Sequence, residues 1–168
     1  FNSIYKFRIS HFIAVPTILS FMDKFSESYE DSFLTEDFKF IVSVAAKLEV
    51  HLWQNIEQKF KTQLVNVYGL TETVAGSIFC ATGIFPRKIG TIGVPVDCEI
   101  KLTTDEGTLV KTGEKGNLWL KGKHVFAGYF NNKLATDNIL KDGWLDTGDV
   151  AIQDKEGFYT IAGRTKNV

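Results

Sequence analysis

Residues 63–76 read QLVNVYGLTETVAG, and this stretch decides how the first half of the chain folds. Its opening part, residues 63–69, is a short apolar run that ends at a glycine, which predicts a buried strand. Thr71 and Glu72 follow at once, so polar side chains stand where the strand ends. In open α/β sheets ligands bind beyond the carboxyl ends of the strands, so we expect a binding site here.

The residues before this stretch alternate between apolar runs and amphipathic segments. Residues 11–16 and 38–46 predict two further buried strands. Residues 17–28 predict a helix capped by Thr17, and residues 48–61 carry apolar side chains every fourth position, as an amphipathic helix does. Strands and helices that alternate at these lengths predict a largely parallel sheet with crossover helices.

The sequence changes character from about residue 89, where glycine-containing turns separate short β-rich runs. This pattern is typical of β-hairpins. The predicted strands are residues 98–104, 116–122, 150–154 and 158–163. Residues 132–140 predict one short helix. We therefore expect an α/β part followed by a small antiparallel β subdomain, which makes the chain α+β as a whole.

Composition excludes several broad classes. The chain has 168 residues, of which 44% are apolar, and a net charge of −1, so it is typical of a globular protein and lacks the basic surface of a nonspecific nucleic-acid binder. Its longest apolar stretch, residues 11–21, is shorter than the roughly 20 residues that a membrane span needs. Cys80 and Cys98 lie in apolar surroundings, which predicts buried reduced thiols and, without a signal-peptide pattern, a cytoplasmic protein. The three histidines lack metal-ligand spacing.

The residue types from 68 to 72 suit a nucleotide. Tyr68 offers a flat ring on which a base can stack, and Gly69 lets the backbone approach a ligand closely. The hydroxyl of Thr71 can donate to a phosphate oxygen, and the carboxylate of Glu72 is a hard oxygen ligand suited to Mg²⁺. From these residues alone the alternative is a strand-to-turn segment with a half-buried tyrosine and a surface acid.

Asp149 and Arg164 form a second pair of candidates. Asp149 follows a Thr-Gly step in GWLDTGDVA (143–151), and a carboxylate held by a tight turn can accept hydrogen bonds from both ribose hydroxyls. Arg164 carries a forked, permanently charged group suited to a phosphate or ribose oxygen. The alternatives are that Asp149 only caps a turn and that Arg164 is a surface residue at a strand end.

A series of motifs makes the chain resemble the adenylate-forming enzymes, the superfamily of acyl-CoA synthetases, peptide-synthetase adenylation domains and firefly luciferase. The motifs stand in the family's order at residues 43–48 (SVAAKL), 66–73 (NVYGLTET), 89–96 (IGTIGVPV), 113–132 (GEKGNLWLKGKHVFAGYFNN), 142–149 (DGWLDTGD) and 163–168 (GRTKNV). The resemblance covers essentially the whole chain and implies a fragment from the later part of the large N-terminal domain. It implies a partial α/β subdomain at residues 1–88, a barrel-like β subdomain at 89–162 and the start of a hinge at 163–168.

The resemblance also implies roles for individual residues. Thr71 would bind the α-phosphate of ATP and Glu72 would hold Mg²⁺, so these two are the expected catalytic residues. The expected nucleotide-binding residues are Asn66, Tyr68, Gly69, Thr71, Asp149 and Arg164. The expected acyl pocket consists of Val44, Ala45, Val67, Ala75 and Gly76. Lys166 would lie at the hinge before a mobile C-terminal domain.

The implied activity is ATP-dependent acyl-CoA synthesis from a carboxylic acid, ATP and CoA, with Mg²⁺. Leu70 after Gly69 and Trp144 in DGWLDTGD resemble the acyl-CoA synthetase forms of these motifs, with a fatty acid as the expected substrate. Two alternatives stay open: an acyl-AMP ligase or adenylation domain that loads a carrier protein, and a non-catalytic module that binds a nucleotide or a partner.

Two further expectations concern the chain as a piece of the family's domain. The phosphate-binding loop and the lysine-bearing C-terminal domain of the family are not in this sequence, so we expect the fragment alone to be inactive. We also expect the edge of its sheet to be covered by another chain or by an oligomer. Val44 stands where the family usually has Gly and Lys47 where it usually has Pro, and both departures fall beside the expected acyl pocket.

Overall fold

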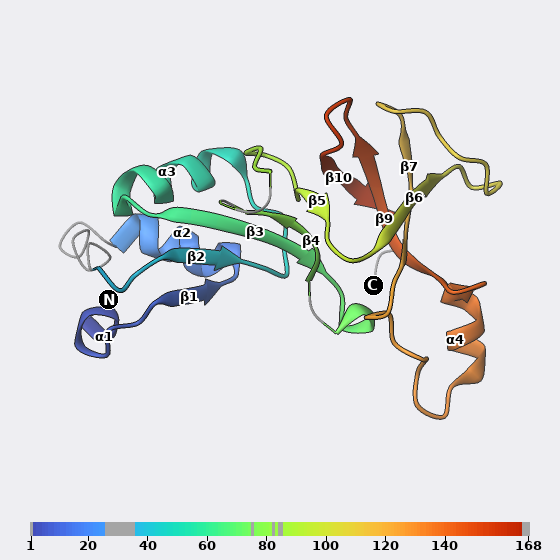
Figure 1. Cartoon of the computed structure of the whole chain (residues 1–168), viewed down its shortest axis with the longest axis horizontal. Coiled ribbons are helices and arrows are strands. Elements are labelled where there is room, and N and C mark those ends of the chain that lie inside the picture. The colour runs from blue at the N-terminus through green and yellow to red at the C-terminus, as the bar shows by residue number, and fades with distance from the viewer. Residues whose placement is uncertain (1, 26–35, 75, 82, 84–85, 166–168) are drawn as a thin grey trace. The chain divides into compact units, whose positions relative to one another are not determined.

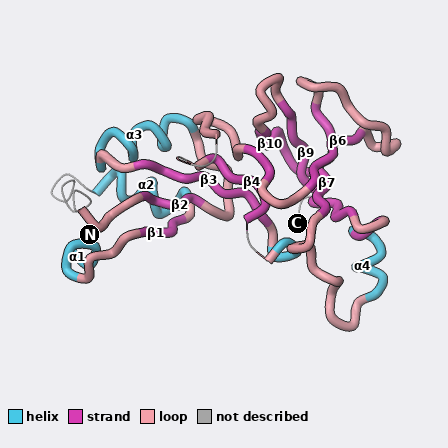
Figure 2. Tube along the Cα trace, in the orientation of Figure 1, coloured by secondary structure: helices cyan, strands magenta, loops and turns pink. Residues whose placement is uncertain are grey.

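The computed structural model describes residues 2–25, 36–74, 76–81, 83 and 86–165. The chain divides into two compact units (Figures 1 and 2). The first unit is Phe1–Val67 with Cys80–Gly90, and the second is Tyr68–Phe79 with Thr91–Val168. The predicted boundaries at residues 88 and 162 stay predictions.

Parallel strands and helices alternate in the first unit (Figure 1). The elements are α1 (Asn2–Lys6), β1 (His11–Ala14), α2 (Pro16–Phe25), β2 (Phe40–Ser43), α3 (Val50–Phe60) and β3 (Gln63–Gly69), whose last two residues belong to the second unit. β2 lies between β1 and β3 and pairs with both in parallel register. This confirms the predicted parallel sheet with crossover helices, and β3 has the bounds expected from the sequence.

Three local predictions in this unit were wrong. Strand β1 ends at Ala14 rather than at residue 16, and it is not a buried strand, because only Ala14 of its four residues is buried. Helix α2 begins at Pro16, so Thr17 is not its cap; proline suits the first helical position because that position needs no backbone N–H. Strand β2 covers only Phe40–Ser43 rather than 38–46, because Ala45 has a φ of 70°, which ends an extended strand.

The core of the first unit lies where α2 and α3 pack against one face of the sheet. The buried side chains of α3 include Leu52, Ile56 and Phe60, which confirms the amphipathic pattern seen in the sequence. They join Leu19 of α2 and Ile41 of β2 in one apolar cluster.

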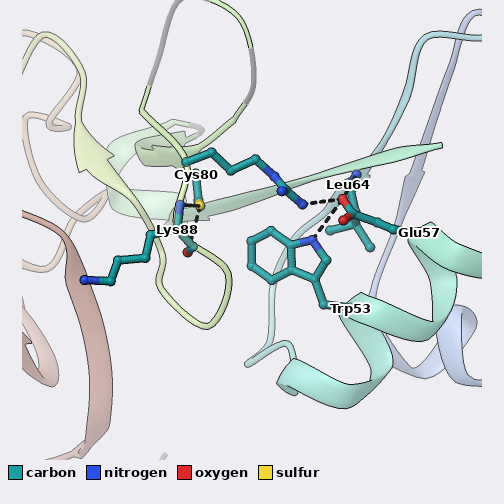
Figure 3. Close-up of polar contacts among 6 residues, drawn as sticks. Trp53, Glu57, Leu64, Cys80 and Lys88 are labelled. Atoms are coloured by element: carbon teal, nitrogen blue, oxygen red, sulfur yellow. Dashed lines mark hydrogen bonds and ion pairs between the residues drawn. The ribbon is translucent and has the colours of Figure 1, made fainter.

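A single carboxylate ties this core together (Figure 3). Glu57 Oε1 accepts hydrogen bonds from Trp53 Nε1 at 3.2 Å and from the backbone N–H of Leu64 at 2.7 Å, and it forms an ion pair with Arg87. Cys80 Sγ contacts the backbone of Lys88. These contacts hold α3, β3 and the segment after Cys80 in register.

The second unit is dominated by an antiparallel sheet (Figure 2). Its elements are the 3₁₀ turn η2 (Thr71–Thr73), β4 (Gly76–Cys80), whose last residue belongs to the first unit, β5 (Val94–Pro95), β6 (Glu99–Thr103), β7 (Lys115–Lys121), α4 (Lys133–Ile139), β8 (Leu140–Lys141), β9 (Trp144–Gln153) and β10 (Tyr159–Arg164). Hydrogen bonds join β10, β9, β7 and β6 in that order, and β8 pairs with β9. The predicted α/β part followed by an antiparallel β subdomain is therefore confirmed.

Strand β9 differs from its prediction in a way that matters for function. It begins at Trp144 rather than at residue 150, so Asp149 lies within a strand and not in a tight turn. The register with β7 shifts at this point, Gly148 has a φ of 70°, and Thr147 Oγ1 donates to Leu118 O at 2.7 Å. The irregularity is a β-bulge, and bulges re-aim side chains.

Both cysteines are free, as predicted, although Cys98 is only half-buried. Burial raises the pKa of the Cys98 thiol. Within the described ranges, no helix is both long and apolar enough to cross a membrane.

Candidate nucleotide-binding site

Tyr68, Asp149 and Arg164 meet in the second unit. The phenol of Tyr68 donates to Asp149 Oδ2 at 2.6 Å, and Arg164 Nε lies 2.8 Å from Asp149 Oδ1. The Asp149 side chain is 7% exposed, whereas that of Arg164 is 50% exposed. Three residues that the sequence singled out separately therefore form one connected group, and the turn-cap role for Asp149 is ruled out.

The bulge of β9 sets the position of Asp149. Its backbone N–H donates to Thr147 Oγ1 at 3.1 Å, and Gly148 N donates to Asp146 Oδ1 at 3.0 Å. In β10, Arg164 is the register partner of Asp149, which explains why the guanidinium reaches the carboxylate. Each carboxylate oxygen has two lone pairs, so both oxygens can still accept a hydrogen bond from a diol.

Burial, reinforced by the negative charge of Asp149, raises the pKa of the Tyr68 phenol well above its usual value. The phenol therefore remains protonated and acts as a donor at every physiological pH. Its ring packs against the apolar core of this unit, which includes Ile78 and Tyr159.

The turn after β3 presents a hydroxyl and an acid. Thr73 is buried, and its Oγ1 both accepts from Leu70 N and donates to Leu70 O, each at 3.0 Å, so it locks the turn. Thr71 is exposed, and its hydroxyl has no hydrogen-bond partner in the described part of the chain. The structure thus leaves Thr71, rather than Thr73, available to a ligand.

Glu72 has a partner that the sequence did not reveal. Tyr129 donates from its phenol to Glu72 Oε1 at 2.5 Å, and Phe126 N donates to the backbone oxygen of Glu72 at 2.8 Å. The hydrogen bond to Glu72 raises the pKa of Tyr129 to about 12. Tyr129 lies in the Gly-Tyr segment of the fourth motif, but 57 residues separate it from Glu72, so no local pattern links them.

The described residues contain no group of three or more His, Cys, Asp or Glu side chains able to enclose a metal. Mg²⁺ does not require such a group, because it commonly binds one or two carboxylates together with substrate phosphates and water. Glu72 fits this role: Oε1 accepts from Tyr129, while Oε2 receives no hydrogen bond from a described residue.

The remaining predicted site residues are divided between the units. Val44, Ala45, Asn66 and Val67 belong to the first unit, where Ser43 of β2 pairs with Asn66 of β3, so Val44 and Ala45 follow at the same end of the sheet as Asn66. Asn66 is buried, and Val44 is half-buried. The other members are placed as follows: Gly69 ends β3, Gly76 begins β4, and Ala75 and Lys166 lie outside the described residues.

A comparison with known families shows which family the chain belongs to. The model of the family described as AMP-binding enzyme matches residues 1–130. The chain belongs to the AMP-binding enzyme family. Among its relatives, the long-chain-fatty-acid–CoA ligase of Haemophilus influenzae is 37% identical over 142 residues, which cover 79% of this chain and 25% of that protein. The luciferin 4-monooxygenase of Photuris pensylvanica is 32% identical over 172 residues, which cover 99% of this chain and 31% of that protein.

Solved structures of AMP-binding enzymes share the fold. The anthranilate CoA ligase AuaEII in complex with anthranoyl-AMP superposes with a TM-score of 0.89 at 27% identity, over 97% of this chain and 31% of that one. The o-succinylbenzoate coenzyme A synthetase of Bacillus subtilis, in complex with ATP and magnesium ion, gives a TM-score of 0.82 at 27% identity, over 97% of this chain and 33% of that one. The chain thus spans about a quarter to a third of the length of these relatives.

Proposed function

We propose that this chain forms part of an ATP-dependent acid–CoA ligase and supplies its adenosine-binding and metal-binding residues. The observation that carries the proposal is the connected group of Tyr68, Asp149 and Arg164 in the same unit as the exposed Thr71 and the half-buried Glu72. The group combines an aromatic ring, a buried carboxylate that can accept from a diol, and a cation. This set suits the base, the ribose and the phosphate of one nucleotide.

The roles follow from the chemistry of each group. The Tyr68 ring would stack on adenine, the backbone at Asn66 and Gly69 would border the base, and Asp149 would accept from the ribose hydroxyls, with Arg164 beside it. Thr71 would donate to an α-phosphate oxygen. Glu72 would hold Mg²⁺, which supplies charge neutralisation of the phosphates when bound.

The reaction proceeds in two steps. A carboxylate oxygen of the acid attacks the α-phosphorus of ATP, and the bond to the leaving pyrophosphate breaks, giving acyl-AMP. The thiol of CoA then attacks the acyl carbon, loses its proton and releases AMP. The protein contributes mainly position and charge stabilisation in the first step. A hinge at Lys166 would let one site serve both steps.

We propose a fatty acid as the substrate and CoA as the acceptor. The support is the identity of 37–43% to several long-chain-fatty-acid–CoA ligases and the form of the motifs around Leu70 and Trp144. The proposed acyl pocket is Val44, Ala45, Val67, Ala75 and Gly76. We also propose a cytoplasmic location, which the free thiols support.

The decisive experiment is acid-dependent ATP–pyrophosphate exchange by the full-length protein that contains this chain, across fatty and aromatic acids. Exchange with long-chain acids followed by acyl-CoA formation is the expected result. The absence of exchange with every acid would overturn the enzymatic role in favour of a non-catalytic binding module. If the adenylate accumulates despite added CoA, and its acyl group is transferred only to a carrier protein, then the acceptor is the carrier protein and not CoA.

A further inference from the structure

Glu72 is held at two points by one later segment. The phenol of Tyr129 donates to its carboxylate at 2.5 Å, and Phe126 N donates to its backbone oxygen at 2.8 Å. The loop that carries Phe126 and Tyr129 therefore fixes both the backbone and the side chain of the residue that the proposed function assigns to the metal.

Tyr129 is itself held in place by several contacts. Its ring meets Phe126 edge-on, with centroids 5.0 Å apart at 79°. Its backbone N–H donates to Thr136 Oγ1 at 2.9 Å, and the Thr136 hydroxyl donates to the carbonyl oxygen of Asn132 at 2.9 Å. These contacts within the protein therefore define the position of Tyr129.

Gly128 allows the loop that carries Tyr129 to pack closely against α4. Its φ is 141°, and a Cβ built there would lie 2.6 Å from Thr136 Cγ2, so only glycine allows the loop to approach α4 so closely. The close approach brings Tyr129 N within reach of the Thr136 hydroxyl.

We propose that Tyr129 is a positioning residue that fixes the Glu72 carboxylate so that its free oxygen binds the Mg²⁺ accompanying ATP. The inference rests on the proposed function. Tyr129 contacts neither metal nor nucleotide in this role. A glutamate side chain has many rotamers, and their loss is one of the larger side-chain entropy costs of binding. A fixed hydrogen bond to Oε1 removes that cost before the metal arrives, as partners of metal ligands do in other proteins.

The alternative is that the Tyr129 hydroxyl only stabilises its own loop, so the test must measure the metal directly. The full-length protein is titrated with Mn²⁺, in place of Mg²⁺, in the presence of a non-hydrolysable ATP analogue. Electron paramagnetic resonance then measures the concentration of free Mn²⁺. The variants are Tyr129→Phe, which keeps the ring against Phe126, and Glu72→Gln. Tyr5→Phe is the matched control, because Tyr5 is 73% exposed and lies in the other unit.

We expect Tyr129→Phe to weaken Mn²⁺ binding to the protein–nucleotide complex by about tenfold, Glu72→Gln to weaken it at least as much, and Tyr5→Phe to leave it unchanged. AMP binding without metal should stay the same in all three variants. Unchanged Mn²⁺ binding in Tyr129→Phe, or equal losses with and without metal, would overturn the positioning role while leaving the proposed function intact. A wild-type protein that binds the ATP analogue without any metal dependence would overturn both.

Discussion

The phenol of Tyr68 donates a 2.6 Å hydrogen bond to the carboxylate of Asp149, across 81 residues of sequence. Asp149 is buried and also pairs with the half-exposed Arg164. One contact thus joins the end of β3 to the bulge of β9, and it places the aromatic and the acidic component of the proposed adenosine site against each other.

A double-mutant cycle should show that this contact contributes to stability. Tyr68→Phe and Asp149→Asn should each lower the free energy of unfolding by about 1–3 kcal/mol, since each leaves a buried polar group with a weaker partner or none. The double variant should lose less than the sum, with a coupling of about 1 kcal/mol. Chemical denaturation measures all values, and the exposed Tyr5→Phe serves as control. Additive losses would show that the hydrogen bond contributes nothing of its own.

The same pair should give a pH-dependent stability with a defined sign. Because the folded state raises the pKa of Tyr68, the unfolded chain loses this proton first, at its ordinary value near pH 10. The stabilisation is therefore complete below that pH and decreases as the pH rises above it. The free energies of unfolding of wild type and Tyr68→Phe should differ by a constant amount up to about pH 9, and this difference should decrease at higher pH. A gap that instead grows above pH 10 would contradict this assignment.

Ala45 occupies a backbone conformation that suits glycine. Its φ of 70° lies in the left-handed region, which costs a residue with a Cβ about 1 kcal/mol. Ala45→Gly should therefore raise the free energy of unfolding by up to about 1 kcal/mol, despite the greater freedom of glycine in the unfolded chain. Ala46→Gly beside it is the matched control, because Ala46 is also exposed but does not have a positive φ. Equal effects at both positions would exclude strain at Ala45 as the cause.

Val44 should affect the acid more than the nucleotide. It follows β2 directly and stands where the family usually has glycine, so its branched side chain would narrow the proposed acyl pocket. We expect Val44→Gly in the full-length protein to shift the preferred acid length while the KM for ATP changes little. Steady-state kinetics over a series of acids measures both. Equal shifts in the constants for acid and ATP would place Val44 outside the acyl pocket.

Glu57 should be a structural residue of the first unit. Its carboxylate accepts from Trp53 and Leu64 and pairs with Arg87, all with little exposure. Glu57→Ala should lower the free energy of unfolding by about 2–4 kcal/mol, because it leaves a buried backbone N–H, an indole N–H and a guanidinium without their acceptor. Glu57→Gln keeps one acceptor oxygen and should cost less. Glu49→Ala, which removes an exposed ion pair with Lys47, is the control and should change the unfolding midpoint little. Similar midpoints for Glu57→Ala and Glu49→Ala would argue against a structural role.

Local signals in the sequence are sufficient to predict most of the helices and strands, though not all of their bounds, and most of the candidate residues. The period of apolar residues in α3 and the short apolar run of β3 are local signals, because a buried face repeats along one segment. The order of the motifs along the chain is sufficient to indicate the family. Tyr68, Thr71, Glu72, Asp149 and Arg164 were each proposed from residue type and motif, and the structure places all of them in one unit.

The contacts among those residues depend on the tertiary structure. The bulge at Thr147 and Gly148 depends on register with β7, so the sequence predicted a turn where a strand exists. Tyr129 reaches Glu72 through the close packing of Gly128 against Thr136, which no periodicity encodes. Hydrogen bonds such as Tyr68 to Asp149 join residues far apart along the chain, and their geometry is set by how strands pair and loops pack, not by the amino acids next to them.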